Sequence, residues 1–324
     1  MKKQVCIIHK GGRVHTWGED LQQGFLELGH KATLLALRDR SPEERRIEKK
    51  EKLRYWDNPA TIQRIAESIR TSEPSLIIFL NSIGLHEQAH TALRKAAKGV
   101  PMVSWLADHV LDLPDGCLPN LDAVYSFDSA SLPLLENFYQ NTDAKLSHLP
   151  LAVNPARFRD RSIACEKRRA QLVFVGNHTP DRKQAIQNLR ALGVKVSCYG
   201  PRAENGWQVW KRKHVKPAAT SKLYGAHRAV LNMLQFPNTI HGVNLRAYEI
   251  PACGGIGTYP LTSDLPLSFE PQHEIIAYRD LPDLAAQIEA LTPDRMKSLL
   301  HLSQNRVLSQ HTYSHRASRF LTES

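Results

Sequence analysis

The sequence has few cysteines and no long apolar run, and both features limit what the chain can be. It has five cysteines, at positions 6, 117, 165, 198 and 253, without CxxC spacing. This pattern argues against a zinc site or a redox pair, and the odd number argues against a disulfide framework, so we expect reduced thiols. The stretch before His9 holds too few apolar residues for a signal peptide or a membrane span. The sequence therefore predicts a cytoplasmic protein without a transmembrane segment.

Internal repeats and low-complexity segments are also missing, and the composition is that of an ordinary globular protein. The 324 residues, of which 42% are hydrophobic and 23% are charged, suffice for two domains with a cleft between them. The net charge of +11 favours an acidic partner, such as a nucleotide, a nucleic acid or an anionic membrane surface. Much of this charge lies in residues 38–54, where both signs alternate as in an exposed helix or loop rather than a binding surface.

Short apolar runs alternate with helical patterns along the whole chain, which predicts an α/β fold with parallel sheets. In the first half we expect strands at 4–9, 31–37, 75–80, 102–108 and 121–127, and helices at 20–28, 58–70, 86–97 and 131–139. In the second half we expect strands at 171–175, 194–199 and 229–234, with helices at 183–192 and 222–229. These patterns predict two Rossmann-like domains, residues 1–160 and 161–324. The last helix is a candidate to pack back on the first domain.

Two polar positions of the first half follow predicted strands, where ligands bind in open α/β sheets. The loop HKGGRVHTWG comes after the first strand, lacks a GxGxxG pattern and contains His15, which could move a proton near neutral pH. This loop either binds an anion or only turns the chain. Asp108, followed by His109, ends the fourth strand and is a candidate catalytic base, although an Asp at such a place is slightly more often a helix cap or a turn residue.

The segment GVNLRAYEIPACGGIGT, residues 242–258, combines features that suit a nucleotide. The guanidinium of Arg246 matches phosphate oxygens, and Glu249 can accept both hydroxyl protons of a ribose diol. Asn244 adds a polar side chain beside them, and Gly254 lets the backbone approach a ligand closely. Each feature has an ordinary alternative, because Arg246 and Glu249 could form an i,i+3 surface pair and Gly254 could simply cap a helix.

A second candidate anion-binding segment opens the second domain. There a strand ends at Gly176 and Asn177 before a helix, which leaves backbone N–H groups for an anion, and Arg182 adds charge. Gly200 ends the next strand and is included in this candidate donor site. Residues 203–216 carry Trp207 and Trp210 among lysines, and this tract either stacks a base or, more often in proteins, forms a surface segment with anchored tryptophans.

Taken together, these motifs resemble the CgeB-type, spore-maturation-protein-like glycosyltransferases of the GT-B superfamily. The resemblance covers roughly residues 147–317 and rests on six ordered motifs: LPLAVNPARF, QLVFVGNHTPDRKQAIQNL, VSCYGP, NLRAYEIPACGGIGT, HEIIAYRDLPDLAAQI and HTYSHRA. It implies a GT-B fold, in which two Rossmann-like domains face each other across a cleft. The second domain would bind the nucleotide-sugar donor and the first the acceptor.

By position, the resemblance implies that Glu249 holds the donor ribose and that Arg246 and Asn244 lie beside the diphosphate and sugar. Gly176 and Arg182 would border the nucleotide. Many retaining relatives have another glutamate upstream, where this chain has His241, which we keep as a candidate catalytic residue.

The resemblance also implies the donor and the chemistry. We expect no permanently bound cofactor, a UDP-sugar donor before a GDP- or dTDP-sugar, and arginines in place of a metal at the leaving diphosphate. Retention is weakly favoured, and in an inverting reaction His15 or Asp108 would be the base. The acceptor could be a protein, a glycan or other small molecule, a lipid or a nucleic acid. Two alternatives stay open, a nucleotide-sugar epimerase or hydrolase and a basic non-catalytic nucleic-acid-binding protein.

Overall fold

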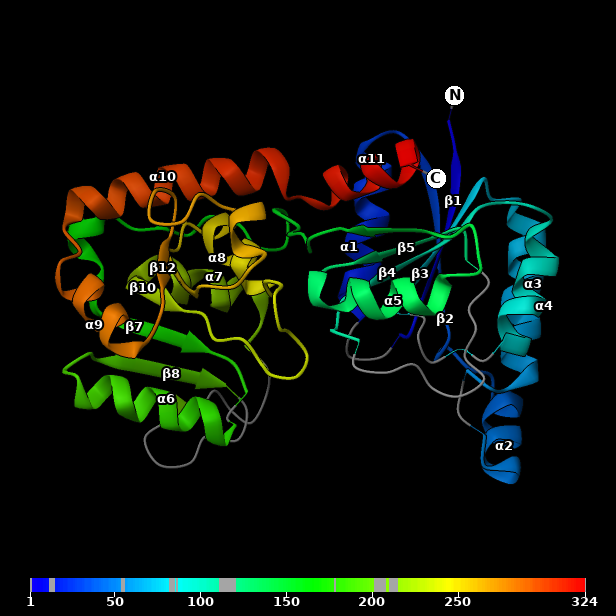
Figure 1. Cartoon of the computed structure of the whole chain (residues 1–324), viewed down its shortest axis with the longest axis horizontal. Coiled ribbons are helices and arrows are strands. Elements are labelled where there is room, and N and C mark those ends of the chain that lie inside the picture. The colour runs from blue at the N-terminus through cyan, green and yellow to red at the C-terminus, as the bar shows by residue number, and fades with distance from the viewer. Residues whose placement is uncertain are drawn as a thin grey trace. The chain divides into compact units, whose positions relative to one another are not determined.

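The computed structural model shows two compact α/β units (Figure 1). It describes residues 2–11, 15–53, 56–81, 85, 87–110, 121–177, 179–200, 208–209 and 215–323. The first unit comprises Met1–Pro150, Pro237–Ile240 and Tyr313–Ser324, and the second comprises Leu151–Phe236 and His241–Thr312. Each unit is built around its own parallel sheet, as the alternation of apolar runs and helical patterns predicted.

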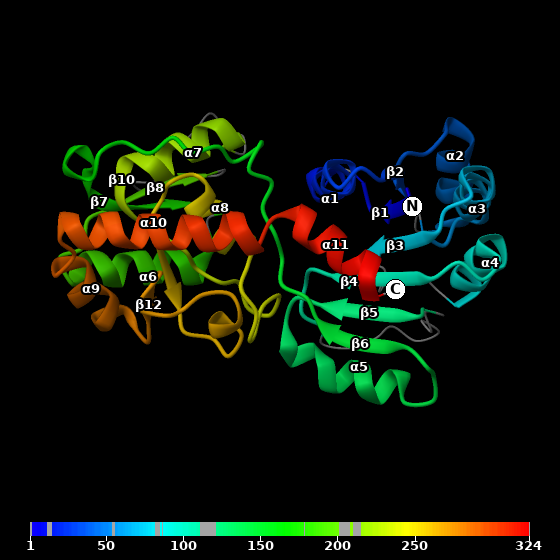
Figure 2. The same cartoon turned by 90° about the horizontal axis from the view of Figure 1, so that it is seen from above.

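The sheet of the first unit has six strands in the order β2-β1-β3-β4-β5-β6, and all its neighbours are parallel. This order can be followed in Figure 2. The strands are β1 (Gln4–His9), β2 (Lys31–Ala36), β3 (Leu76–Leu80), β4 (Met102–Leu106), β5 (Ala123–Ser126) and β6 (Lys145–His148). β3, β4 and β5 are buried along their whole length, which explains their continuous apolar sequences.

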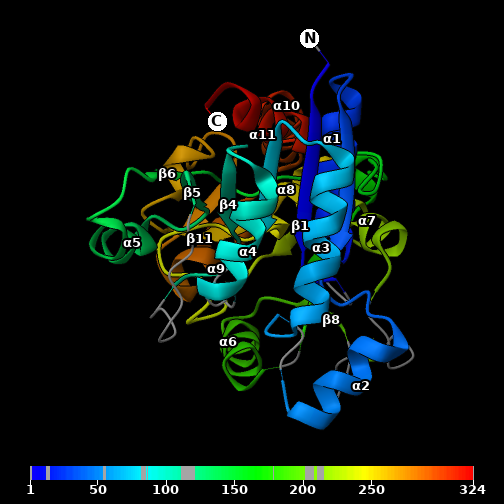
Figure 3. The same ribbon diagram turned by 90° about the vertical axis from the view of Figure 1, so that its right-hand side faces the viewer.

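Helices cover both faces of this sheet. On one face, α3 (Pro59–Ser72), α4 (Glu87–Ala97) and α5 (Leu132–Tyr139) share a core with the strands, and Figure 3 shows α3 and α4 side by side. On the other face, α1 (His15–Glu27) packs against α11 (Tyr313–Glu323). Phe320 of α11 makes edge contacts with the rings of Trp105 and Tyr125. The last helix of the chain therefore belongs to the first unit.

The sheet of the second unit is also parallel, in the order β12-β11-β10-β7-β8-β9. Its strands are β7 (Arg169–Val175), β8 (Val196–Gly200), β9 (Gln208–Val209), β10 (His227–Leu231), β11 (Gly257–Pro260) and β12 (Ile276–Tyr278). Counted from β7, this is the strand order of a dinucleotide-binding Rossmann sheet, whose direction of growth reverses between β7 and β10. Ligands bind such sheets at the carboxyl ends of the strands beside this reversal.

Two groups of helices flank the second sheet. The helices α6 (Pro180–Ala191) and α9 (Leu281–Glu289), with the first turns of α10 (Pro293–Gln310), bury apolar side chains in one cluster with the strands. The helices α7 (Pro217–Ala226) and α8 (Arg246–Ala252) contribute Tyr224, Ile250 and neighbouring residues to a second cluster with Val173, Val175 and Val230. The four described cysteines, at positions 6, 165, 198 and 253, are free and buried.

Several predicted boundaries are wrong for identifiable reasons. α1 starts at His15 rather than at residue 20, so the helix includes Gly18. This glycine packs closely on β2, since a Cβ at position 18 would come within 2.8 Å of Leu34 Cδ1. Pro217 starts α7 five residues before the predicted helix, and β10 begins at His227, where the prediction had helix. The short strand β6 was not predicted, because its sequence KLSH is polar and half-exposed.

Candidate donor site

A cavity of about 280 Å³ lies in the second unit at the carboxyl ends of β7 and β8. Eleven residues line it: Phe158, Val175, Gly176, Asn177, Gly200, Val215, Pro217, Thr220, Tyr224, Arg246 and Glu249. Its volume is near the lower limit of small-molecule sites. Five of these residues, Gly176, Asn177, Gly200, Arg246 and Glu249, were selected from the sequence, and they come together here from three separate segments.

Two glycines form the wall where β7 and β8 end. A Cβ on Gly200 would stand 1.9 Å from the carbonyl oxygen of Gly176, and one on Gly176 would meet Phe174 at 2.8 Å and Arg246 Nη2 at 3.3 Å. The N–H of Gly176 donates to the carbonyl of Tyr199 at 2.9 Å. The backbones of the two strand ends therefore touch directly, and this one wall of the cavity is main chain rather than side chain.

The helix α8 supplies the charged side of the cavity. Arg246 starts the helix and Glu249 lies one turn later, so both reach the same space. Arg246 lies close to the hydroxyl of Tyr224, a residue of α7 that is 1% exposed. Burial raises the pKa of Tyr224 far above its usual value, although Arg246 opposes this shift, so the phenol stays neutral. Tyr224 was not selected from the sequence, because nothing in α7 marks it as a partner of α8.

Arg182 lies behind this wall and is 5% exposed. Its Nη1 donates to the carbonyl of Asn177 at 3.4 Å, its Nη2 donates to that of Met233 at 3.3 Å, and its guanidinium lies 5.6 Å from the centre of the Phe174 ring. Burial, followed by the charge of Arg246, lowers the pKa of Arg182 to about 10. Among the described residues, no carboxylate forms an ion pair with Arg182 or Arg246. The two cations repel each other, and an anion bound in the cavity next to Arg246 would reduce this repulsion.

Asn244 takes part in a buried polar cluster at the end of β10. Its Nδ2 donates to Asn232 Oδ1 at 3.0 Å and to the carbonyl of Met233 at 3.4 Å, the same carbonyl that Arg182 holds. Its Oδ1 and the Nδ2 of Asn232 are buried without a hydrogen-bond partner in the part of the chain that the structure describes. Asn244 therefore ties the loop before α8 to the end of β10, the strand that lies next to β7 where the sheet reverses its direction of growth.

Two further predicted residues, like Arg182 and Asn244, are not among those that line the cavity. Gly254 follows α8 with φ +72°, its N–H donates to the carbonyl of Pro251 at 2.9 Å, and the N–H of Gly255 donates to that of Ile250 at 2.9 Å. This is the Schellman cap of a helix, the ordinary alternative weighed for this glycine. His241 is half-buried, and its carbonyl accepts the N–H of Asp264 at 3.1 Å.

In the first unit, Asp108 lies at the carboxyl end of β4 and is held on both oxygens. Oδ2 accepts from Asn81 at 3.0 Å, and Oδ1 accepts from Asn238 at 3.3 Å. His109 beside it has a more fixed setting, because its Nδ1 lies 2.9 Å from Ser131 Oγ and 3.9 Å from Asp128 Oδ1.

His15 and the tryptophan tract are the remaining positions predicted from the sequence. His15 is the first residue of α1, and its side chain lies outside the described part of the chain. Trp207, Trp210 and most of residues 203–216 lie outside the described residues. Within the described ranges, no three His, Cys, Asp or Glu side chains are grouped as metal ligands would be. None of the described helices combines the length and the apolar composition needed to cross a bilayer.

The chain was compared with protein-family models, curated sequences and solved structures. Residues 181–322, which include Arg182, Asn244, Arg246 and Glu249, match the model of a family described as glycosyl transferase-like. This match covers less than half of the chain. A search of curated protein sequences found no match to the chain.

Solved structures of glycosyltransferases match nearly the whole chain. A glycosyltransferase from Rickettsia africae ESF-5 superposes with a TM-score of 0.69 at 12% identity, covering 99% of this chain and 97% of that chain. The Anabaena protein Alr3699/HepE in complex with UDP-glucose gives 0.68 at 11% identity, covering 99% and 100%. An alpha-glucosyltransferase in complex with UDP and a 13-mer DNA containing an HMU base gives 0.68 at 12%, covering 99% and 98%. The chain has the GT-B fold. The predicted fold class of two Rossmann-like α/β domains is thereby confirmed.

Proposed function

We propose that the chain is a glycosyltransferase that moves a sugar from a nucleotide-sugar donor to an acceptor hydroxyl. The observation that carries the proposal is the cavity of the second unit, which collects Gly176, Asn177, Gly200, Arg246 and Glu249 at the ends of β7 and β8. Support comes from the glycosyl transferase-like family match over residues 181–322 and from the UDP-sugar bound by the Anabaena neighbour. The CgeB-type resemblance adds that the second half of the chain, predicted from the sequence as residues 161–324, binds the donor, and that the first half, predicted as residues 1–160, binds the acceptor.

In this proposal each side chain of the cavity has a distinct task. Glu249 accepts the two hydroxyl protons of the donor ribose. Arg246 contacts the diphosphate, and Arg182 stabilises its charge from behind the wall, so that the leaving group is neutralised without a metal. Main-chain groups at Gly176, Asn177 and Gly200 border the nucleoside, and the two glycines, which have no side chain, let it approach closely. The loop held by Asn244 carries Arg246 into place, and Gly254 caps α8 behind it.

UDP-sugars are the preferred donors in this proposal, ahead of GDP- and dTDP-sugars, and retention is favoured weakly over inversion. Retention needs no base in the acceptor domain. For inversion, the candidate bases His15 and Asp108 are joined by His109, because Ser131 fixes its ring and the carboxylate of Asp128 would compensate the charge of a protonated ring. His241 stays a further candidate catalytic residue. Any acceptor that offers a hydroxyl group fits this donor site, and the acceptor classes kept in the proposal are proteins, glycans, lipids, other small molecules and nucleic acids.

The test is a calorimetric and thermal-shift screen of the full chain against UDP, GDP, dTDP and their sugars, with EDTA and then with Mg²⁺. A ligand present at a hundred times its Kd stabilises the fold by about 2.7 kcal/mol. We expect UDP and one UDP-sugar to bind in EDTA, and Glu249→Gln to weaken both by about 10-fold or more, since a charge-assisted hydrogen bond contributes roughly 1.5–3 kcal/mol. Glu289→Gln, an exposed change at the end of α9, is the matched control. Absence of binding by every nucleotide would overturn the proposal.

A further inference from the structure

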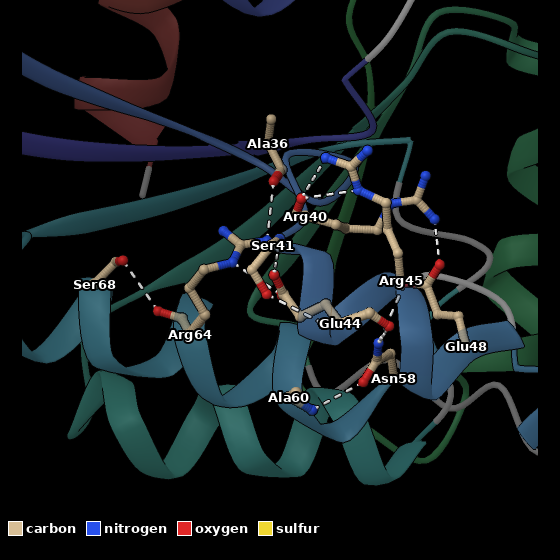
Figure 4. Close-up of polar contacts among 10 residues, drawn as sticks. All are labelled: Ala36, Arg40, Ser41, Glu44, Arg45, Glu48, Asn58, Ala60, Arg64 and Ser68. Carbon is tan, nitrogen blue, oxygen red and sulfur yellow. Dashed lines mark hydrogen bonds and ion pairs between the residues drawn. The ribbon is translucent and has the colours of Figure 1, made fainter. Parts of the chain in front are cut away.

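Helix α2 (Pro42–Glu51) of the first unit turns two of its carboxylates inward. Glu44 is 4% exposed and Glu48 is 8% exposed, on a helix whose other charged residues face solvent. Figure 4 shows both carboxylates directed toward side chains of the preceding loop and of α3. A sequence of alternating signs, which we expected to form an evenly solvated segment, is thus sorted by packing into two faces.

The inward face is joined to the preceding loop and to the start of α3 by several hydrogen bonds. Arg64 Nε donates to Glu44 Oε1 at 3.0 Å, and Arg40 forms an ion pair with Glu48. Asn58 Nδ2 donates to the Glu44 carbonyl at 2.9 Å and to Glu48 Oε1 at 3.3 Å. The N–H of Ser41 donates to Glu44 Oε2 at 2.5 Å, which with the reverse bond to Ser41 Oγ makes a capping box. These bonds fix the rotation of α2 about its own axis.

The outward face of α2 is left with an excess of positive charge. Five basic residues are exposed on it or at its C-cap: Arg45, Arg46, Lys49, Lys50 and Lys52. Only Glu43 and Glu51 remain as exposed acids, because the other two acids of the segment point inward. Residues 42–52 therefore carry a net +1 by sequence but a net +3 on their surface, counting five bases against four acids and then against two.

We propose that this outer face of α2, the α2 basic face, binds the phosphate backbone of a nucleic acid. The face carries no exposed aromatic side chain, and its exposed apolar surface is limited to Pro42 at the start of the helix, since Ile47 is half-buried. It therefore lacks the anchors of a protein interface and the apolar half of a membrane-surface helix. What it offers is a row of cations about 6 Å apart at i,i+4 along a rigid helix, the requirement for sequence-independent contact with phosphates. The charge of the whole chain, +11, attracts the same partner.

The proposal does not depend on the donor chemistry of the second unit. Arg46, Lys49 and Lys50 are the residues to test, because they are exposed and no described residue pairs with them. Arg45 is left intact, since its guanidinium donates to the carbonyl of Arg40 at 2.9 Å and 3.2 Å and so supports the fold.

The experiment measures the binding of the full chain to a fluorescein-labelled 24-bp DNA duplex and to a 24-nucleotide RNA by anisotropy, at several NaCl concentrations. The test variant is Arg46→Ala, Lys49→Ala, Lys50→Ala. We expect the log–log salt slope for the duplex to lose about 2–3 in magnitude, since each phosphate contact contributes about 0.9. Affinity at 100 mM salt should fall at least 10-fold, while the melting temperature is unchanged.

A control variant removes the same charge from other places on the first unit, with Arg70→Ala, Lys95→Ala and Lys145→Ala, all exposed residues. It should keep the wild-type salt slope. Equal losses in the two variants would show that only net charge matters and would overturn the proposal, as would failure of the wild-type chain to bind either nucleic acid. Vesicles of phosphatidylcholine and phosphatidylglycerol form the last arm, and α2-dependent binding to them at equal or higher affinity would assign the face to a membrane instead.

Discussion

Helix α2 of the first unit and the donor-site cavity of the second unit both bury charged side chains, and they differ in the partners that these side chains have. Around α2, the carboxylate of Glu44 is paired with Arg64, and that of Glu48 with Arg40 and Asn58. At the cavity, the charge of Arg246 acts on Arg182, and the two arginines have carbonyls, a ring, a phenol and the single carboxylate of Glu249 as described neighbours. Burying a charge is costly unless a partner compensates it. The balanced group therefore serves the fold, whereas the unbalanced one is suited to an anion from outside.

The atoms that surround the two groups of charges also differ. The network at α2 is made of long side chains that can adjust, while the cavity wall is made of main chain at Gly176 and Gly200. A ligand site with excess charge needs a fixed frame, because charged side chains that are free to move would turn away from each other and leave the site. Four measurements would break or sharpen this comparison.

The largest effect is expected for Gly200→Ala. Its Cβ would stand 1.9 Å from a backbone oxygen, so β7 and β8 must separate, and we expect a loss of about 3 kcal/mol or more in the free energy of unfolding. Urea denaturation measures it. Gly193→Ala is the control, because its Cβ meets nothing within 4 Å and only the positive φ of +83° is strained, at about 1 kcal/mol. Equal losses would mean that the wall yields, contrary to the rigid frame proposed.

Arg246→Met should separate binding from stability. The variant removes the repulsion of Arg182, so we expect the free energy of unfolding without ligand to stay within about 1 kcal/mol of the wild type. UDP affinity should fall by roughly 1.5–3 kcal/mol with the lost charge-assisted contact. Calorimetry and denaturation measure the two quantities. Arg190→Met, an exposed arginine of α6 that donates to the Val196 carbonyl, should leave UDP affinity unchanged. A large destabilisation by Arg246→Met would make this arginine a structural residue like those at α2.

Arg64→Met is the counterpart on the balanced side. It leaves the buried carboxylate of Glu44 without its guanidinium partner, which in a fully buried pair costs several kcal/mol. Because a third of the Arg64 side chain is exposed, water would compensate in part, and we expect a loss of about 2 kcal/mol in the free energy of unfolding. Arg70→Met, on the exposed side of the same helix, should cost less than about 0.5 kcal/mol. If both variants are equally stable, the α2 network contributes nothing to the fold.

The sequence predicts the frame of both regions better than their charge pairing. β1 and β3 were located from their buried apolar runs, and Gly176, Gly200, Arg246 and Glu249 were selected from strand ends and one motif. Arg182 and Arg246 were selected separately, but their mutual repulsion depends on the strand order around β7 and β10, which the sequence does not specify.

At α2 the limit of the sequence is similar. Glu44 and Glu48 are one helical turn apart and so share a face, yet their burial depends on Arg64 and Asn58 of a later helix. Acidic side chains are ordinarily exposed, so the mixed-sign run was interpreted as solvated. Only the packing of α2 against the loop after β2 and the start of α3 shows that its two faces differ in charge.

The smallest effect concerns the pH dependence of the balanced group. Burial acts to raise the pKa of Glu44, but the Ser41 N–H, the Arg64 guanidinium and the Thr61 hydroxyl together hold the pKa below its ordinary value of 4.5. A carboxyl whose folded pKa is lowered stabilises the fold above its unfolded pKa, and this contribution disappears as the pH falls through the folded value. Glu44→Gln should therefore cost about 1 kcal/mol at pH 7, and progressively less below about pH 4.5.

Urea denaturation of the wild type, Glu44→Gln and the exposed control Glu43→Gln between pH 3 and pH 7 gives the three curves needed. The difference between wild type and Glu44→Gln should narrow on acidification, while Glu43→Gln should follow the wild type throughout. A difference that stays constant with pH would show that Glu44 acts through its shape and neutral hydrogen bonds rather than its charge. In that case the inward face of α2 would need no ionised carboxylates, and charge balance would no longer distinguish it from the donor-site cavity.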